Sequence, residues 1–410
     1  MVWWAATISF AGDGIYNGAL PLLSASITRD PAAISWTTVM ARCGWLMVGL
    51  LSGVLVDRWI KTRVMWRVDA IRAAVVTVFA TLVVTGHAGM PTIYAVALLL
   101  GLAGPFFDNA GSAVLPRLVK ASNLERANSW NQTSSLICVT LVGPPLGAAL
   151  FVWNHGVPLF LQAATFVIAS ALVASLARVA TPPVVTGPRS LRTELGDGLR
   201  YLLRHRLLRT LALLLAAINA VTGIVLSLLV LYNLDVLGYP KAAYGWLISV
   251  YAVGGLLGTV LVPTLRARLG TFTAVLLAAF GFTVGTLLLG LRPSLPFVVT
   301  GIMVTAAGSA LWNVVTQSLR QRIVPPAMLG RVTGIYRMVG MGAMPVGAAA
   351  GGLIARATSV PDAYVVGGLV LVAAIAAAVV PLRAGLADLE RQTAAEGHAD
   401  AVGLAETRPR

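Results

Sequence analysis

Long apolar stretches alternate with short polar connectors along almost the whole chain. A helix that crosses the ~30 Å hydrocarbon core of a membrane needs roughly 20 mostly apolar residues, and twelve stretches are long enough. They lie at residues 2–27, 36–56, 69–87, 92–115, 128–153, 159–177, 207–235, 244–264, 271–291, 297–317, 332–356 and 363–382. Connectors such as "HAGMP" and "GYPKAA" are typical of turns between antiparallel neighbours. The pattern predicts an all-α membrane protein with twelve transmembrane helices.

Composition and charge agree with this class. The chain is 58% hydrophobic and only 11% charged, whereas about a quarter of the residues in soluble domains are charged. The net charge of +15 is typical of nucleic-acid binding only in a soluble protein; here basic residues are expected in cytoplasmic loops. With both termini placed in the cytoplasm, only Arg29, Lys241, Arg292 and Arg356 fall on the opposite side. We therefore expect a multi-pass protein of the bacterial cytoplasmic (inner) membrane, with both termini cytoplasmic and no nucleic-acid partner.

The longest connector divides six helices from six. The predicted organisation is an N-terminal six-helix bundle (1–177), a cytoplasmic linker (178–206), a C-terminal six-helix bundle (207–382) and a disordered tail (383–410). Within the linker, "LRTELGDGLRYLLRHRLL" predicts an amphipathic helix lying on the inner leaflet.

The two halves also repeat one another. "VGLLSGVLV" (48–56) aligns with "GGLLGTVLV" (254–262), and "PLGAAL" (145–150) aligns with "PVGAAA" (345–350). Two repeats related by an axis along the membrane normal indicate a transporter whose binding site lies near the midplane, between the halves.

Asp13 is the first candidate for a proton-coupling residue. It lies ten residues after Trp3, hence about 15 Å along a helix at 1.5 Å per residue. Ionisable residues at that depth are costly and are functional candidates. Gly12 and Gly14 on either side predict a local break in the helix. Arg42 is the natural partner of Asp13, although it could equally extend to the periplasmic interface, and the pair could instead hold helices together permanently.

Four polar side chains lie at the depth of a substrate cavity, where each could bind substrate or bond a neighbouring helix: Tyr16, Asn17, Asn219 and Asn313. The few cysteines and histidines are scattered, so no metal or other cofactor is expected. No phosphate-binding loop is present, which excludes ATP as the energy source. An enzyme would need a nucleophile, an acid–base pair or a metal cluster facing one compartment, and none is found.

The stretch "GLLSGVLVDRWIKTRV" (49–64) passes from hydrocarbon into charge within one helical turn. Gly49 and Gly53 are four residues apart and form a small-residue face for close helix packing. Basic residues beyond Asp57 can bind anionic lipid headgroups. An alternative is that these charges merely fix the orientation of the helices in the membrane. That would explain the basic residues but not Asp57.

The same stretch resembles motif A of the major facilitator superfamily. The residues that carry the resemblance are Gly53, Leu55, Asp57, Arg58, Lys61 and Arg63, with Ile60 in place of the usual glycine. "GPFFDNAGSAVLPRLV" and "GRVTGIYRMVGMGAMPVGA" resemble the branch of enterobactin and macrolide exporters. The resemblance implies the major facilitator fold and alternating access. It also implies that motif A and an acidic residue of helix 4, Asp108, latch the outward-open state, although Asp108 could instead serve in proton coupling.

"GPPLGAAL" in helix 5 resembles motif C, which occurs mainly in exporters that exchange substrate for protons. Gly143, Pro144 and Gly147 would kink this helix and permit close packing; the alternative is an ordinary packing seam. Helix 4 lacks the arginine of the family's motif B, an element of its proton relay.

The sequence thus predicts a proton-coupled exporter of amphiphilic small molecules such as a drug, an antibiotic or a siderophore. Its expected partners are the substrate, protons and anionic lipid headgroups, and a monomer is expected. Two alternatives stay open: a proton symporter for uptake with the same fold, and a membrane sensor that transports nothing.

Overall fold

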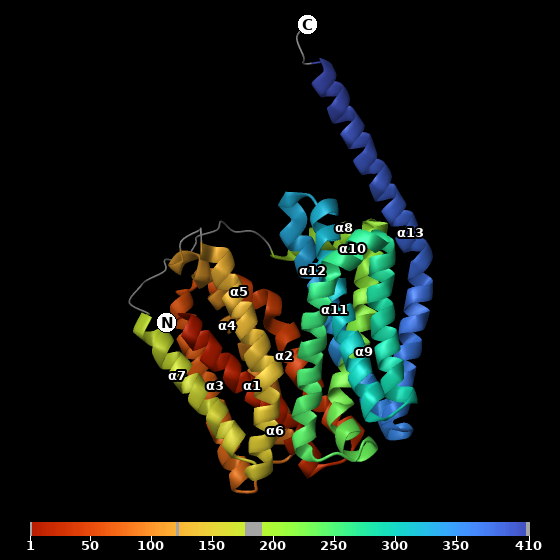
Figure 1. The fold of residues 1–410 in the computed structure, drawn as a ribbon. Helices are drawn as coiled ribbons and strands as arrows, with labels where there is room; N and C mark the ends of the chain where they lie inside the picture. Colours follow the sequence, from red (N-terminus) through yellow and green to blue (C-terminus); the bar gives the residue numbers. More distant parts are fainter. Residues whose placement is uncertain (1, 120–122, 177–190, 407–410) are drawn as a thin grey trace.

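The computed structural model describes residues 2–119, 123–176 and 191–406, and the described chain is helical apart from short connections (Figure 1). Some side chains within these ranges, that of Asp57 among them, lie outside the description. The first half comprises α1 (Val2–Ile27), α2 (Pro31–Arg58), α3 (Lys61–Val84), α4 (Met90–Leu118), α5 (Leu124–Ser135), the π-helix η2 (Leu136–Val142), α6 (Gly143–Trp153) and α7 (Val157–Leu176). After α8 (Leu191–Arg204), the second half comprises α9 (Arg206–Leu231), the π-helix η3 (Tyr232–Val236), α10 (Lys241–Leu291), α11 (Leu295–Ile323), α12 (Pro326–Ala357) and α13 (Val360–Glu406).

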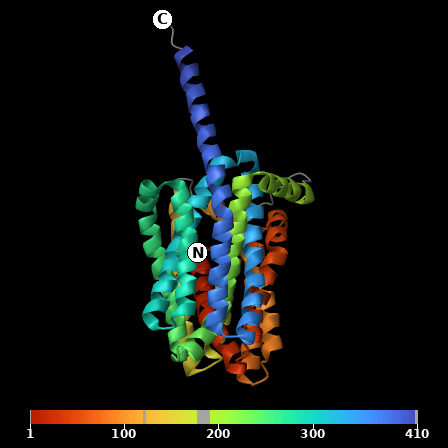
Figure 2. The same ribbon diagram turned by 90° about the vertical axis from the view of Figure 1, so that its right-hand side faces the viewer.

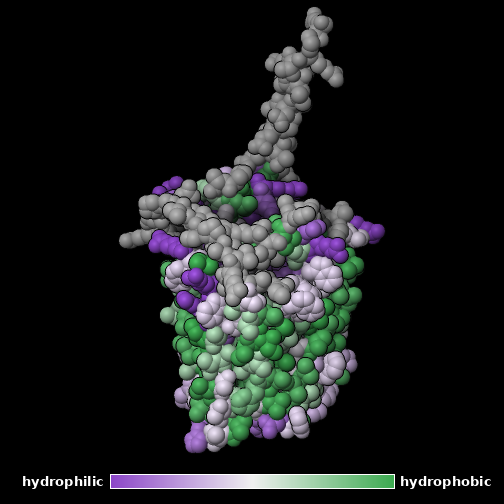
Figure 3. Space-filling model, turned by 90° about the vertical axis from the view of Figure 1, so that its left-hand side faces the viewer, coloured by the Kyte–Doolittle hydropathy of each residue, from purple (hydrophilic) through white to green (hydrophobic). Residues whose placement is uncertain are grey.

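Nine segments of the described chain are long and apolar enough to cross a membrane. Two of them lie in α10, which Gly270 divides with a left-handed backbone (φ 71°). Helices α1, α2 and α3 have 26, 28 and 24 residues, which is long enough to cross a membrane. The lateral face in Figure 3 is largely apolar, with polar side chains gathered mainly toward the α8 end. The predicted all-α membrane class is confirmed.

Buried apolar side chains form three clusters that reveal how the halves meet. One cluster contains residues of both halves, for example Leu22 and Phe79 with Leu228 and Tyr364. The second lies within the second half and the third within the first half. The halves therefore share a core at the end remote from α8, here called the closed end, and have separate cores at the α8 end.

Polar contacts at the closed end also join the halves. The Ser35 hydroxyl on α2 donates to the Ser227 hydroxyl on α9 at 3.3 Å. Ser249 on α10 donates to the carbonyl of Leu141 in η2. Gly245 on α10 lies directly against Pro144, with no space for a side chain. The two halves thus touch backbone to backbone at this end.

Two ion pairs cross the same boundary. Arg29 Nη1 lies 3.0 Å from Asp235 Oδ1, and Arg356 Nε lies 3.7 Å from Asp30 Oδ1. The connection between α1 and α2 therefore presents one cation and one anion, side by side, to opposite charges on the second half.

Two predicted boundaries are wrong. The third span begins at Lys61 and not at residue 69, because the aliphatic stem of Lys61 is buried and the helix extends past the polar residues at its start. The tail predicted to be disordered continues α13 as far as Glu406 and extends beyond the bundle (Figures 1 and 2). Its alanine, leucine and glutamate residues favour helix, and extending an existing helix avoids the cost of nucleation.

The predicted linker helix is present as α8, but residues 177–190 lie outside the described residues. The bounds predicted for the two six-helix bundles stay a prediction.

Candidate functional site

Helix α1 carries Asp13 through the first half without a break, contrary to the prediction from its flanking glycines. A side chain at position 12 would meet Thr165 of α7, and one at position 14 would meet Cys138 and Gly143. A glycine inside a helix costs roughly 1 kcal/mol relative to alanine, which the close packing offsets. The glycines around Asp13 therefore allow α6 and α7 to approach, and the helix does not open.

A buried charge pair lies on α3, behind Asp13. Asp69 is 0% exposed, and its Oδ1 accepts from Arg72 Nη1 at 3.5 Å. The Arg72 guanidinium lies 5.4 Å from the ring centres of both Phe107 on α4 and Phe166 on α7. The face of an aromatic ring attracts a cation electrostatically. Unlike a carboxylate, the ring does not take up the hydrogen-bond donors of the guanidinium. Arg72 is thus held among three helices of the first half.

Asp13 belongs to the same group of charges. It interacts electrostatically with Arg72 and with Asp108 of α4, and the buried carboxamide of Gln162 on α7 lies beside it. Asp13 is half-buried and Asp108 is exposed. Asp108 also senses Arg337 of α12, in the other half. The carboxyl groups of Asp13, Asp69 and Asp108 thus all interact with the Arg72 guanidinium, and that of Asp108 also interacts with Arg337 across the boundary.

The structure gives Asp13 a basic neighbour other than the predicted Arg42. Among the described residues, the guanidinium that acts on Asp13 is that of Arg72, and Arg42 forms no ion pair. Arg42 is half-buried on α2. Arg42 lies fifteen residues before Asp57 along α2. This spacing gives the depth of Arg42 in the membrane, but it does not tell which neighbouring helix its side chain faces.

Sequence reasoning missed Asp69, Arg72 and Gln162. The apolar pattern starts the third span at residue 69, so Asp69 and Arg72 fall at its beginning and do not stand out as intramembrane charges. The i, i+3 spacing of an acid and a base in an otherwise apolar helix was the available signal. No local signal distinguished Gln162, whose role follows only from the packing of α7 against α1.

Motif C forms a contact between backbones. A side chain at position 147 would meet the carbonyl of Ile15, and one at position 18 would meet Pro144. Pro144 and Pro145 donate no amide hydrogen, so the helix widens into η2 just before them. The predicted kink is therefore a π-helical segment, and Gly143 and Gly147 pack α6 against α1.

Motif A lies at the α8 end, where α2 turns into α3. Asn109 Nδ2 of α4 donates to the Ser52 hydroxyl at 2.8 Å, beside Gly53. Lys61 is buried, whereas Leu55, Arg58 and Arg63 are exposed. The side chain of Asp57 lies outside the described residues, and the described partners of Asp108 are internal charges. The latch therefore stays a prediction.

The four predicted cavity residues differ in exposure. Asn17 and Asn313 are exposed, while Tyr16 and Asn219 are half-buried. The amides of Asn219 and Asn313 each donate to a carbonyl of their own helix at 3.0 Å. The Tyr16 hydroxyl is buried and has no hydrogen-bond partner. Neither asparagine amide is thus engaged by a neighbouring helix.

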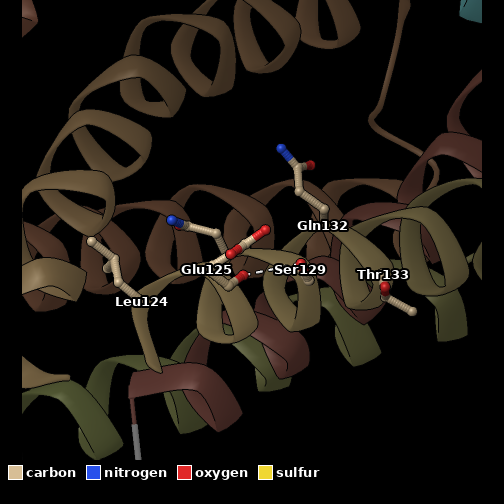
Figure 4. A pocket seen from close by; sticks show the side chains of 6 residues that line it. Leu124, Glu125, Ser129, Gln132 and Thr133 are labelled. Carbon is tan, nitrogen blue, oxygen red and sulfur yellow. Dashed lines mark hydrogen bonds between the residues drawn. The ribbon is translucent and has the colours of Figure 1, made fainter. Parts of the chain in front are cut away.

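A polar pocket of about 720 Å³ lies on α5, at the α8 end of the span that η2 and α6 complete (Figure 4). It is lined by Leu124, Glu125, Asn128, Ser129, Gln132 and Thr133. The Ser129 hydroxyl donates to the Glu125 carbonyl at 3.0 Å. The spacing of these residues gives α5 one polar face near the end where the halves have separate cores.

Two helical bundles joined at one end, with an ion pair buried inside the first of them, are the arrangement expected of a membrane transporter. The sequence matches the transmembrane secretion effector family, MFS_3, over residues 1–406. The chain belongs to this family of the major facilitator superfamily, as its motifs predict, and to the branch of the enterobactin exporters.

Curated relatives match almost the full chain. An uncharacterised MFS-type transporter, y4rN of Sinorhizobium fredii (strain NBRC 101917 / NGR234), is 28% identical over 92% of this chain and 93% of its own. The enterobactin exporter EntS of Salmonella typhi is 28% identical over 90% and 89%.

Among solved structures, a bacterial homologue of the iron transporter ferroportin in its inward-facing state gives a TM-score of 0.71. It covers 93% of this chain and 97% of its own at 19% identity. The same homologue in its outward-facing state gives 0.64, covering 94% and 98% at 18% identity. The fold is shared with both.

Proposed function

We propose that this protein is a proton-coupled exporter of amphiphilic small molecules that works by alternating access. The observation that carries the proposal is the group of Asp13, Asp69, Asp108 and Arg72 within the helices of the first half. Carboxyl groups in a transmembrane bundle commonly form proton relays.

We propose further that the α8 end faces the cytoplasm, so that both termini are cytoplasmic. Basic side chains are exposed at this end, among them Arg58, Arg63 and Arg204, and basic residues favour the cytoplasmic side. The structure then represents an inward-facing state, which is supported by its greater similarity to the inward-facing ferroportin homologue.

The relatives support export rather than uptake. The curated relatives named as enterobactin exporters cover about nine-tenths of the chain. The glycine–proline packing of α6 on α1 is the motif C arrangement typical of proton-exchanging exporters. The substrate would enter from the cytoplasm or the inner leaflet, past the polar face of α5. Release of the substrate outside and protonation of Asp13 would favour the return to the inward-facing state.

The experiment is efflux from proteoliposomes under an imposed proton gradient, with a panel of fluorescent and antibiotic amphiphiles. Asp13→Asn is compared with wild type and with Asp388→Asn, which changes an exposed acid on α13 that pairs only locally with Arg391. We expect the gradient-driven component to vanish in Asp13→Asn while substrate binding survives, and to persist in the control. Undiminished gradient-driven efflux in Asp13→Asn would rule out Asp13 as the coupling residue. Gradient-driven uptake by wild type would favour the symporter, and no flux would favour a sensor.

A further inference from the structure

Asp69 is the most enclosed carboxyl group of the charge cluster. Its side chain is 0% exposed, and its Oδ2 atom is buried without a hydrogen-bond partner. Its other oxygen has one long hydrogen bond, 3.5 Å to Arg72 Nη1. A buried carboxylate needs a close cation or several donors to remain ionised. This environment is therefore better suited to the neutral, protonated acid.

The surrounding charges point the same way. The charged groups acting on Asp69 in the described part of the chain are Arg72 on its own helix, Asp13 of α1 and Asp108 of α4. From α7, the buried polar group beside this cluster is the neutral Gln162. Arg72 is thus shared by three carboxyl groups. Like charges this close cannot all ionise in a low-dielectric interior.

The position of Arg72 determines which carboxyl groups can share it. Phe107 and Phe166 hold the guanidinium between α4 and α7, and its Nε is buried without a partner. A side chain at Gly104 would lie 3.3 Å from Nη2, so the glycine leaves room for the guanidinium. The fork of donors therefore contacts Asp69 through Nη1, while its charge also acts on Asp13.

We propose that Asp69 is a proton-binding carboxyl of the transport cycle, linked to Asp13 by Arg72 as their shared counter-ion. When Asp13 is ionised, Arg72 pairs with it and Asp69 keeps its proton. When Asp13 takes up a proton, Arg72 pairs with Asp69, whose O–H bond at Oδ2 breaks and whose proton leaves to solvent. One proton is gained, one is lost, and no other bond changes. The proposal rests on the proton coupling proposed above and adds a second site to it.

Infrared difference spectroscopy of the purified full-length protein in lipid nanodiscs tests the site without any substrate. A protonated carboxyl group has a C=O stretch that is distinct from the amide bands and moves on exchange into D₂O. We expect wild type at neutral pH to show this band, Asp69→Asn to lose it, and Asp388→Asn to keep it. Asp13→Asn should weaken it, because Arg72 is then free to pair with Asp69.

The band persisting in Asp69→Asn, or its absence from wild type at neutral pH, would overturn the proposal. If Asp69→Asn does not fold, Asp69→Glu decides: the band must then change its frequency, and an unchanged band overturns the site. Efflux separates this proposal from the exporter function. Band loss in Asp69→Asn with no efflux by wild type supports the proton site and contradicts export. Full gradient-driven efflux by Asp69→Asn supports export and contradicts a role of Asp69 in the cycle.

Discussion

The two ion pairs at the closed end are expected to influence the equilibrium between conformations in which this end is closed and conformations in which it is open. Arg29 and Asp30 are neighbours in the chain, and their partners Asp235 and Arg356 belong to the other half. If these pairs help to hold the closed end together, Asp235→Asn should shift the population toward states in which this end is open.

The expected size follows from the exposure of the pair. The side chains of Arg29 and Asp235 are 52% and 47% exposed at a separation of 3.0 Å. Solvent-exposed pairs contribute roughly 0.2–1 kcal/mol, which corresponds to a change of about 1.4- to 5-fold in the equilibrium at RT ≈ 0.59 kcal/mol. Such a shift is small for folding but measurable in a conformational equilibrium near balance.

Distances between spin labels at this end would measure the shift. Labels on Trp153→Cys and Leu291→Cys, both exposed at the ends of α6 and α10, report on the two halves once Cys43 and Cys138 are replaced by alanine. The matched control is Asp362→Asn, since among the described residues Asp362 bonds with Ser359 of its own half.

We expect Asp235→Asn to increase the fraction of molecules with a long distance between the labels. The double variant Arg29→Asp/Asp235→Arg, which exchanges the two charges, should restore the wild-type distance distribution. The reasoning is refuted if Asp235→Asn behaves like Asp362→Asn, or if the swapped pair fails to restore the wild-type distribution.

Two further predictions concern packing and pH. Gly147→Ala should lower the melting temperature, because the added Cβ would meet the carbonyl of Ile15 and overpacking typically costs about 1–3 kcal/mol. The control Gly255→Ala should leave the melting temperature unchanged, because a Cβ at that position meets no atom within 4 Å. Equal melting temperatures of the two variants would contradict the packing account. Partial burial, and secondly the charge of Lys241 from the other half, lower the pKa of the His155 imidazole at the closed end. When this end opens and Lys241 moves away, the His155 imidazole binds a proton more readily. The closed state is therefore favoured at higher pH and loses stability as the pH falls. Spin-label distances measured from pH 8 to pH 5 should show opening on acidification in wild type but not in His155→Gln, and a pH response that survives in the variant would refute the assignment.

The internal charge cluster shows what sequence patterns alone could predict of the site. Asp13 stood out because a carboxyl group deep in an apolar helix is costly and therefore selected for a purpose. Its partner could not be chosen from the sequence, since spacing along a helix gives depth but not the direction in which the helix faces. Depth alone favours Arg42, whereas in the structure Arg72, held between α4 and α7, is the guanidinium that interacts with Asp13.

The glycines give a similar lesson with a different outcome. Gly12 and Gly14 favoured a break in α1, because isolated glycine weakens a helix. The break is absent, since both positions lie against neighbouring helices that only glycine allows so close. Gly143 and Gly147 were predicted to pack closely and do so, although the helix they approach was not known.

The membrane class and the family could be predicted from the amino-acid sequence. Both follow from the length of apolar runs, the distribution of arginine and short motifs, and each of these signals is local to its segment. Which end is closed, which carboxyl groups interact with Arg72 and which charges join the halves became known from the three-dimensional arrangement of the helices. Those properties depend on the rotation of each helix about its own axis and on where the two halves touch. Side-chain packing between segments distant in the sequence determines both the rotation and the place of contact.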